Sequence, residues 1–190
     1  MSKTLPPEIE EHWARIKRPM GMQINLSPRQ IYAIGRVIVQ WGALEPMLIF
    51  HVSLWRMSPL IPESLRADAP PSHANNKDRI SFLRACADYI IKNNETMRKE
   101  FHQKLAQIQG CKNKRDWFAH GTYDLQSNQS EETICVNYKK HKLRLATAKV
   151  EKLANDISLL TGWIMNFETR LHEDVLRASL EKLISRQVKS

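Results

Sequence analysis

Apolar residues at helical spacing constrain this chain more than any other feature of its sequence. Between residues 31 and 55, and again between residues 150 and 175, they recur every three or four positions, which is the period of one helical face. Shorter runs with the same spacing lie at residues 77–92 and 95–119. The sequence therefore predicts an all-α protein, an up-and-down bundle of about four main helices.

Several residues are typical of helix ends. Ser27 followed by Pro28 predicts the start of the first helix, and Asn94 and Thr147 are expected to cap the third and the last. Gly121 is placed to end the third helix.

Three residues inside the first helix break its regular pattern. Pro46 is expected to kink the helix, because proline removes one backbone donor and crowds the preceding turn. Gly35 and Gly42 lie seven residues apart and predict a small patch where another helix can approach closely.

The period changes from helical to alternating after residue 132. The stretches TICVNY and KLRLAT predict a small two-stranded hairpin before the last helix, with its turn near Lys139 to His141. We expect an N-terminal segment at residues 1–24, which could form a short peripheral helix. A single helical domain should follow at residues 25–178, and residues 179–190 should form a fraying tail.

Composition limits the classes of function that fit this chain. The formal net charge of +9 favours anionic partners, nucleic acid first. The three cysteines lack metal-ligand or redox spacing, which predicts reduced thiols, no metal site and a cytoplasmic protein. No stretch offers the roughly 18 uninterrupted apolar residues of a membrane helix, so no membrane partner is expected, and no cofactor motif is present in the sequence.

Two charged residues fall on apolar stripes. Arg115 shares the helical direction of Ile108, and Glu45 lies among the inward positions of the first helix. A charged group there needs a partner, so we expect the two to meet, directly or through His120. Asp116 lies four residues before His120 on the same flank. Spacing alone leaves two interpretations open: a functional site, or a structural clamp with an ordinary surface pair beside it.

The stretch RDWFAHG, residues 115–121, resembles the Arg-x(4–6)-His signature of HEPN domains. The run IGRVIVQWGALEPML is similar to a Gly, Trp and Leu-Glu pattern of some bacterial HEPN-like proteins, and the helix–hairpin–helix ending also fits them. The similarity extends from about Ser27 to Leu171.

The resemblance implies a homodimeric, metal-independent endoribonuclease that needs no cofactor. His120 would act as general acid or base, and Arg115 would stabilise the phosphoryl transition state, giving a 2′,3′-cyclic phosphate. Asp116 replaces the asparagine often found after the family's arginine, and with Glu45 it completes the predicted catalytic set. The family's two motifs typically line one cleft between the chains.

RNA is the expected substrate, and a set of basic residues is expected to bind its phosphates. The set comprises Lys112, Lys114, Lys139, Lys140, Lys142 and Arg144. Trp117 points away from the Ile108 stripe and is expected either at a dimer interface or against the hairpin. The alternative function is a non-catalytic module that binds nucleic acid or a partner, such as an antitoxin protein, within a toxin–antitoxin or phage-defence system.

Overall fold

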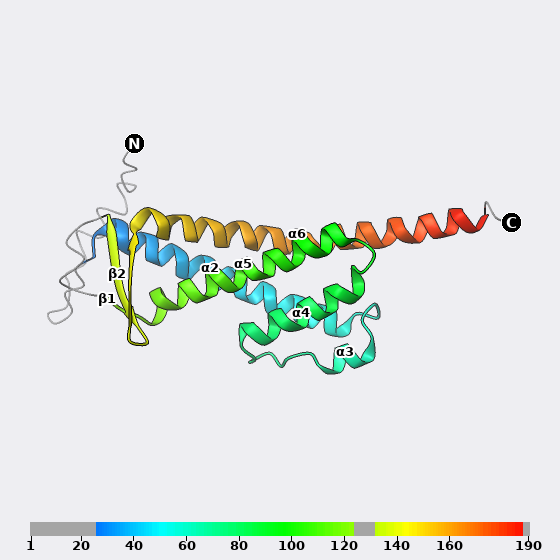
Figure 1. Cartoon of the computed structure of the whole chain (residues 1–190), viewed down its shortest axis with the longest axis horizontal. Helices are drawn as coiled ribbons and strands as arrows, with labels where there is room; N and C mark the ends of the chain where they lie inside the picture. The colour runs from blue at the N-terminus through cyan, green and yellow to red at the C-terminus, as the bar shows by residue number, and fades with distance from the viewer. Residues whose placement is uncertain (1–25, 124–131, 188–190) are drawn as a thin grey trace.

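The computed structural model describes residues 26–123 and 132–187, and the side-chain surroundings of those up to residue 173. Within these ranges the chain forms five helices and one three-stranded antiparallel sheet, which confirms a mostly helical protein (Figure 1). The elements in chain order are α2 (Pro28–Met57), α3 (Glu63–Ala67), α4 (Asn76–Ile90), α5 (Glu95–His120), β1 (Thr122–Tyr123), β2 (Thr133–Tyr138), β3 (His141–Ala146) and α6 (Thr147–Gln187). The expected N-terminal segment at residues 1–24 lies outside the described residues.

The predicted up-and-down bundle requires successive long helices to run in opposite directions, and the structure differs from this prediction. α2 and α6 lie side by side and run the same way (Figure 1), since Arg29 pairs with Glu151 near their starts and Trp55 donates to Glu168 near the end of α2. The connection after α2, which contains α3, carries the chain back along that helix. α4 therefore also runs with α2, and of the four long helices α5 alone runs in the opposite direction.

The predicted cap residues at the starts of α2 and α5 are confirmed. The Ser27 hydroxyl accepts a hydrogen bond from the Gln30 backbone N–H, and the Gln30 side chain accepts one from Ser27, which forms a capping box. The Asn94 side chain accepts from the Met97 N–H at 3.0 Å. These bonds satisfy donors that a helix leaves unpaired at its first turn.

α2 is continuous across Pro46. Both Pro46 and Gly42, whose carbonyl lacks its usual donor because of that proline, are exposed. Water can replace the lost donor there, so the proline does not end the helix.

The outer face of α2 is apolar and open. Tyr32, Val39 and Phe50 expose 41%, 69% and 55% of their surface, and no atom lies near a Cβ built at Gly35 or Gly42. The predicted close approach of a second helix at these glycines is therefore absent from the described part of the chain. By length and composition α2 could cross a membrane, and a third of its most apolar window is buried in the bundle.

An aromatic cluster joins the end of α2, the start of α5 and the middle of α6. Phe101 of α5 lies 5.4 Å from Trp55 of α2 and 4.4 Å from Phe167 of α6, measured between ring centroids. Beside it, the Glu100 carboxylate accepts hydrogen bonds from Arg170 and Trp163. Mainly because of the Arg170 bonds, the pKa of Glu100 is lowered to about 2, so this link between α5 and α6 is charged at neutral pH.

The sheet lies across the end of the bundle where α2 and α6 begin and α5 ends (Figure 1). The predicted hairpin is present as β2 and β3, but β1 also pairs with β2 and was not predicted. Two residues are too few for an alternating pattern, so the sequence carries no signal for β1. The turn residues Lys139 and Lys140 have φ angles of 47° and 65°, a left-handed conformation that costs about 1–2 kcal/mol per non-glycine residue.

α6 begins at Thr147, the predicted cap residue, which is fully buried. It continues to Gln187, past residue 178, where the domain was expected to end. The sequence after that residue holds no proline or glycine that would stop a helix.

Gly121 ends α5 for a reason other than backbone handedness. Its φ of −82° and ψ of 158° are open to any residue. A Cβ at this position, however, would overlap the Val136 side chain and the Trp117 carbonyl oxygen. Glycine is required here because β2 passes directly over the helix end.

Replacing Gly121 with alanine should therefore destabilise the protein. We expect Gly121→Ala to lower the free energy of unfolding by about 1–3 kcal/mol through overpacking, as measured by urea denaturation. Gly110→Ala is the matched control, because Gly110 lies in the same helix with open space at its Cβ. That variant should be neutral or more stable, and an equal loss in both variants would contradict the close-approach explanation.

Candidate functional site at the end of helix α5

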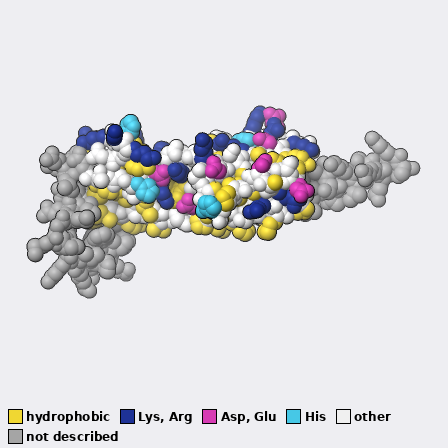
Figure 2. Space-filling view, turned by 90° about the horizontal axis from the view of Figure 1, so that it is seen from below, with side chains coloured by type: hydrophobic (Ala, Val, Ile, Leu, Met, Phe, Trp, Pro, Cys, Tyr) yellow, Lys and Arg dark blue, Asp and Glu magenta, His cyan; other side chains and the backbone are white. Residues whose placement is uncertain are grey.

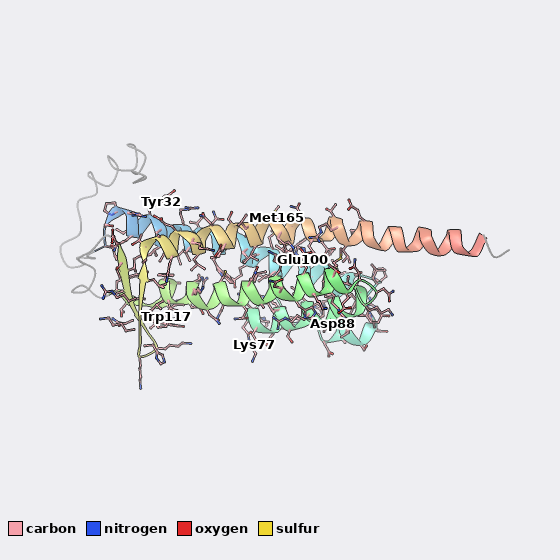
Figure 3. The ribbon with its side chains drawn as sticks, turned by 45° about the horizontal axis from the view of Figure 1, so that its top comes forward. Tyr32, Lys77, Asp88, Glu100, Trp117 and Met165 are labelled. Atoms are coloured by element: carbon pink, nitrogen blue, oxygen red, sulfur yellow. The ribbon has the colours of Figure 1, made fainter. Side chains whose placement is uncertain are left out.

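The last turns of α5 carry most of the predicted catalytic residues, and the sheet holds this helix end in place. The Tyr123 hydroxyl of β1 donates a hydrogen bond to the Phe118 carbonyl at 2.8 Å. Burial raises the pKa of Tyr123 to about 12, so the hydroxyl keeps the proton that it donates. Figure 3 shows Trp117 at this end of α5, next to the hairpin.

Glu45 gathers polar groups from three helices. Its carboxylate accepts hydrogen bonds from Trp41 Nε1 at 3.2 Å and from Asn76 Nδ2 at 2.8 Å. The guanidinium nitrogens of Arg79 and Arg115 lie 3.6 and 4.0 Å from its oxygens. Glu45 and Arg115 thus approach each other as the apolar stripes predicted, although at the outer limit of an ion pair.

Arg115 is held on several sides. Its Nη1 donates to Asp116 Oδ1 at 3.2 Å, and its guanidinium carbon lies 5.5 Å from the centre of the Trp41 ring. Only 22% of the side chain is exposed, and its Nε has no hydrogen-bond partner among the described residues. The guanidinium is therefore fixed in place, with its charge shared between two carboxylates.

Asp116 does not pair with His120 as the spacing allowed. Its second carboxylate oxygen lies 2.7 Å from Lys112 Nζ, one turn earlier on α5. Arg115 and Lys112 together occupy both oxygens of this carboxylate, and a hydrogen bond between two charged groups is stronger than one between neutral groups. Lys112, which was predicted to bind RNA phosphates, is thereby engaged within the protein.

His120 is exposed at the edge of the helix. Its ring lies 6.4 Å from that of Tyr138, measured between centroids, and it makes no hydrogen bond within the described ranges. It lies five positions after Arg115, so at about 100° per residue the two side chains leave the helix about 140° apart. The structure therefore does not bring guanidinium and imidazole into direct contact.

The predicted basic residues do not form one surface. Lys139 and Lys140 lie at the hairpin tip, directly after Tyr138, whose ring neighbours that of His120. Lys142 and Arg144 point to the opposite face of β3 from Leu143, which faces the bundle.

Lys114 lies on another side of α5. It lines a groove of about 410 Å³ between α5 and α6, together with Lys104 and Lys152. Basic side chains are scattered over the face in Figure 2 in the same way. Of this set, the two tip lysines lie beside the His120 and Tyr138 rings, and the phosphate-binding role of all six residues stays a prediction.

Three residues at the site were not predicted: Asn76, Arg79 and Tyr138. Arg79 is buried, and it donates to the Asn76 side chain and to the Ser72 carbonyl, both at 2.6 Å. Arg79 could have been found from the sequence, because it lies four residues before Leu83 on an apolar stripe. A charged residue on an apolar stripe is also what identified Arg115. Tyr138 had no such signal. The ring centroids of Trp117 and Tyr138 are 5.7 Å apart. This contact agrees with the prediction that Trp117 packs against the hairpin.

Comparison with protein-family models, with curated proteins and with solved structures gave no match. The HEPN assignment therefore stays a prediction that rests on the sequence motif. Among the residues that the structure describes, no group of three or more His, Cys, Asp or Glu side chains could hold a metal ion.

The geometry predicts unequal roles in stability for the two motif residues. Arg115→Ala should lower the free energy of unfolding by about 1–3 kcal/mol, because it removes a largely buried cation that lies between the Glu45 and Asp116 carboxylates and against the Trp41 ring. His120→Ala should change it by less than about 0.5 kcal/mol, because the ring is exposed. Urea denaturation of both variants tests this, and a larger loss for His120→Ala would contradict the described network.

Proposed function

We propose that this protein is a metal-independent endoribonuclease of HEPN type. The observation that carries the proposal is an exposed imidazole at the end of α5 that makes no hydrogen bond to the described residues. It lies beside Tyr138 and the basic hairpin tip, five positions after a fixed arginine. An imidazole exchanges protons near neutral pH, which suits a general acid or base. RNA as substrate agrees with the net charge of +9 and with the predicted cytoplasmic location.

The proposed reaction transfers a phosphoryl group within the RNA. The ribose 2′-oxygen bonds to the adjacent phosphorus as the bond to the 5′-oxygen breaks, leaving a 2′,3′-cyclic phosphate. His120 takes the proton of the 2′-hydroxyl, and the leaving 5′-oxygen receives a proton from solvent. Arg115 is preorganised by Glu45 and Asp116, so its remaining donors could meet the charge on the phosphoryl oxygens without losing side-chain freedom.

A second candidate is a non-catalytic module that binds RNA or a protein partner such as an antitoxin. It is favoured by the two carboxylates beside Arg115, which repel a phosphate and already occupy the guanidinium. In this case Arg115 is structural, and the hairpin lysines alone contact the ligand. A role in toxin–antitoxin or phage-defence systems is compatible with either candidate.

We also propose that the protein is a homodimer that covers the outer face of α2. The exposed apolar side chains on this face surround glycines that leave room for a second backbone, and a twofold pair of identical helices is the simplest way to cover it. Hydrophobic side chains follow the lower edge of the view in Figure 2. Tyr32 and Met165 lie across the bundle from Trp117 (Figure 3), so this dimer would leave each His120 in its own site. It therefore differs from the shared cleft between chains that the resemblance implies.

RNA cleavage in the presence of a chelator tests the enzymatic proposal. The wild type should cleave unstructured RNA to products with 2′,3′-cyclic phosphate ends. His120→Ala should reduce the rate by about 10²–10⁴-fold, and Arg115→Ala by about 10²–10³-fold. His102→Ala is the matched control, since His102 pairs with Asp88 near the other end of α5. Equal cleavage by all four proteins would exclude these residues from the reaction, and no cleavage by folded wild type would favour the second candidate.

Light scattering coupled to gel filtration tests the dimer. The wild type should elute as a dimer, and Val39→Lys should convert it to a monomer, because the lysine would be buried unpaired at the interface. Leu159→Lys is the control, since Leu159 is equally exposed but lines the groove between α5 and α6. A monomeric wild type would refute the dimer, and co-sedimentation of such a monomer with lipid vesicles would assign the face to a membrane.

A further inference from the structure

Three aromatic rings meet where α5 and β2 end. Tyr138, the last residue of β2, lies on the same face of the sheet as Val136, toward the bundle. Its ring centroid is 5.7 Å from that of Trp117, which packs edge-on, and 6.4 Å from that of His120. The Tyr138 and His120 rings are tilted by only 31°. Tyr138 is half-buried and His120 exposed, so both rings contribute to the accessible surface at this end of the bundle.

The adjoining turn carries lysine at positions where lysine is unfavourable. Lys139 and Lys140 form the two-residue turn between β2 and β3, and both have positive φ. Such a turn favours Asn-Gly, because glycine and asparagine adopt this conformation at little strain. Both lysines are exposed, so packing does not compensate for their strain. A strained backbone at an exposed, charged tip points to a role for the charge.

We propose that this surface binds an unpaired nucleotide of the RNA. The base stacks on Tyr138, beside His120, and Lys139 and Lys140 hold the phosphates that flank it. The inference rests on the proposed function for its substrate and adds the requirement that the bound nucleotide be unpaired. Bases within a duplex keep their faces covered, whereas single-stranded RNA can place one on an aromatic side chain.

One side chain must move for the base to bind. The Lys139 ammonium lies 5.1 Å from the centre of the Tyr138 ring, in a cation–π contact. Such a contact is weak at an exposed site, and the lysine side chain is flexible. A base can therefore replace the ammonium over the ring, and the ammonium then lies within reach of the neighbouring phosphate.

Binding of 2′-O-methyl RNA tests the surface independently of cleavage, because this RNA lacks the attacking hydroxyl. The probes are a short single strand, the same strand with abasic sites, and a duplex of the same sequence. We expect the wild type to bind the intact strand roughly 5- to 100-fold more tightly than the abasic strand. It should also prefer the single strand to the duplex.

Two substitutions of Tyr138 separate the ring from its hydroxyl. Tyr138→Phe should keep the preference for the intact strand, because the ring remains. Tyr138→Leu should bind the intact and abasic strands equally. A Tyr138→Leu protein that retains the preference would overturn the proposal, and so would a wild type that never shows it. If Tyr138→Leu does not fold, quenching of 2-aminopurine in the bound strand by the wild type and by Tyr138→Phe decides instead, since a stacked base is quenched.

The tip lysines have their own test. The double variant Lys139→Asn/Lys140→Gly suits the turn, so it should raise the unfolding midpoint. It should also reduce the slope of log Kd against log salt by about 1.4, since each phosphate contact of a single strand contributes about 0.7. The preference for the intact strand should persist. Lys77→Gln, on α4, is the control and should leave the slope unchanged; equal slopes for both variants would exclude the tip from phosphate binding.

The outcomes distinguish failure of this inference from failure of the proposed nuclease. Base-dependent binding without any cleavage of ordinary RNA would remove the nuclease and leave the surface in place. Cleavage that is unaffected by Tyr138→Leu, with equal binding by the variant and the wild type, would remove the surface and leave the nuclease.

Discussion

A single carboxylate joins three of the four long helices. Glu45 of α2 accepts hydrogen bonds from Trp41 and Asn76, and it lies within ion-pair distance of Arg79 of α4 and Arg115 of α5. A partly buried charge without partners is strongly unfavourable, so these groups favour one relative placement of the helices. That placement determines where α5 ends, and hence where Gly121 meets β2 and where His120 emerges.

The same network bears on whether Arg115 has a catalytic or a structural role. A guanidinium that is already fixed loses little freedom when it binds a phosphoryl oxygen, which favours catalysis. Two carboxylates within 4.0 Å of it also lower the local positive potential, which favours a structural role. The nuclease and the binding module therefore differ in whether the remaining donors of Arg115 reach the ligand, while His120 is accessible in both.

The sequence predicted what depends on local pattern. The long helices, the caps at Ser27 and Asn94 and the approach of Glu45 to Arg115 all followed, because a stripe of apolar residues shows at once which charges are turned inward. The direction of α4 did not follow, because it depends on how the connection after α2 folds back. The pairing of Asp116 with Lys112 was missed because two partners shared one flank of α5, and spacing could not rank them.

Only part of the hairpin tip could be predicted from the sequence, and the reason is physical. Alternation placed Tyr138 on the same face as Val136, but it does not say which helix end that face meets. Tyr138 therefore carried no functional signal, and Lys142 and Arg144 were grouped with the tip lysines by their closeness in sequence. The pairing of β1 with β2 shows which helix end lies beside Tyr138. β1 continues directly from α5 through Gly121, and it pairs Thr122 with Asn137, the neighbour of Tyr138. The spacing of the His120 and Tyr138 rings is therefore set by strand register, so a ligand that moves the end of β2 also moves the imidazole.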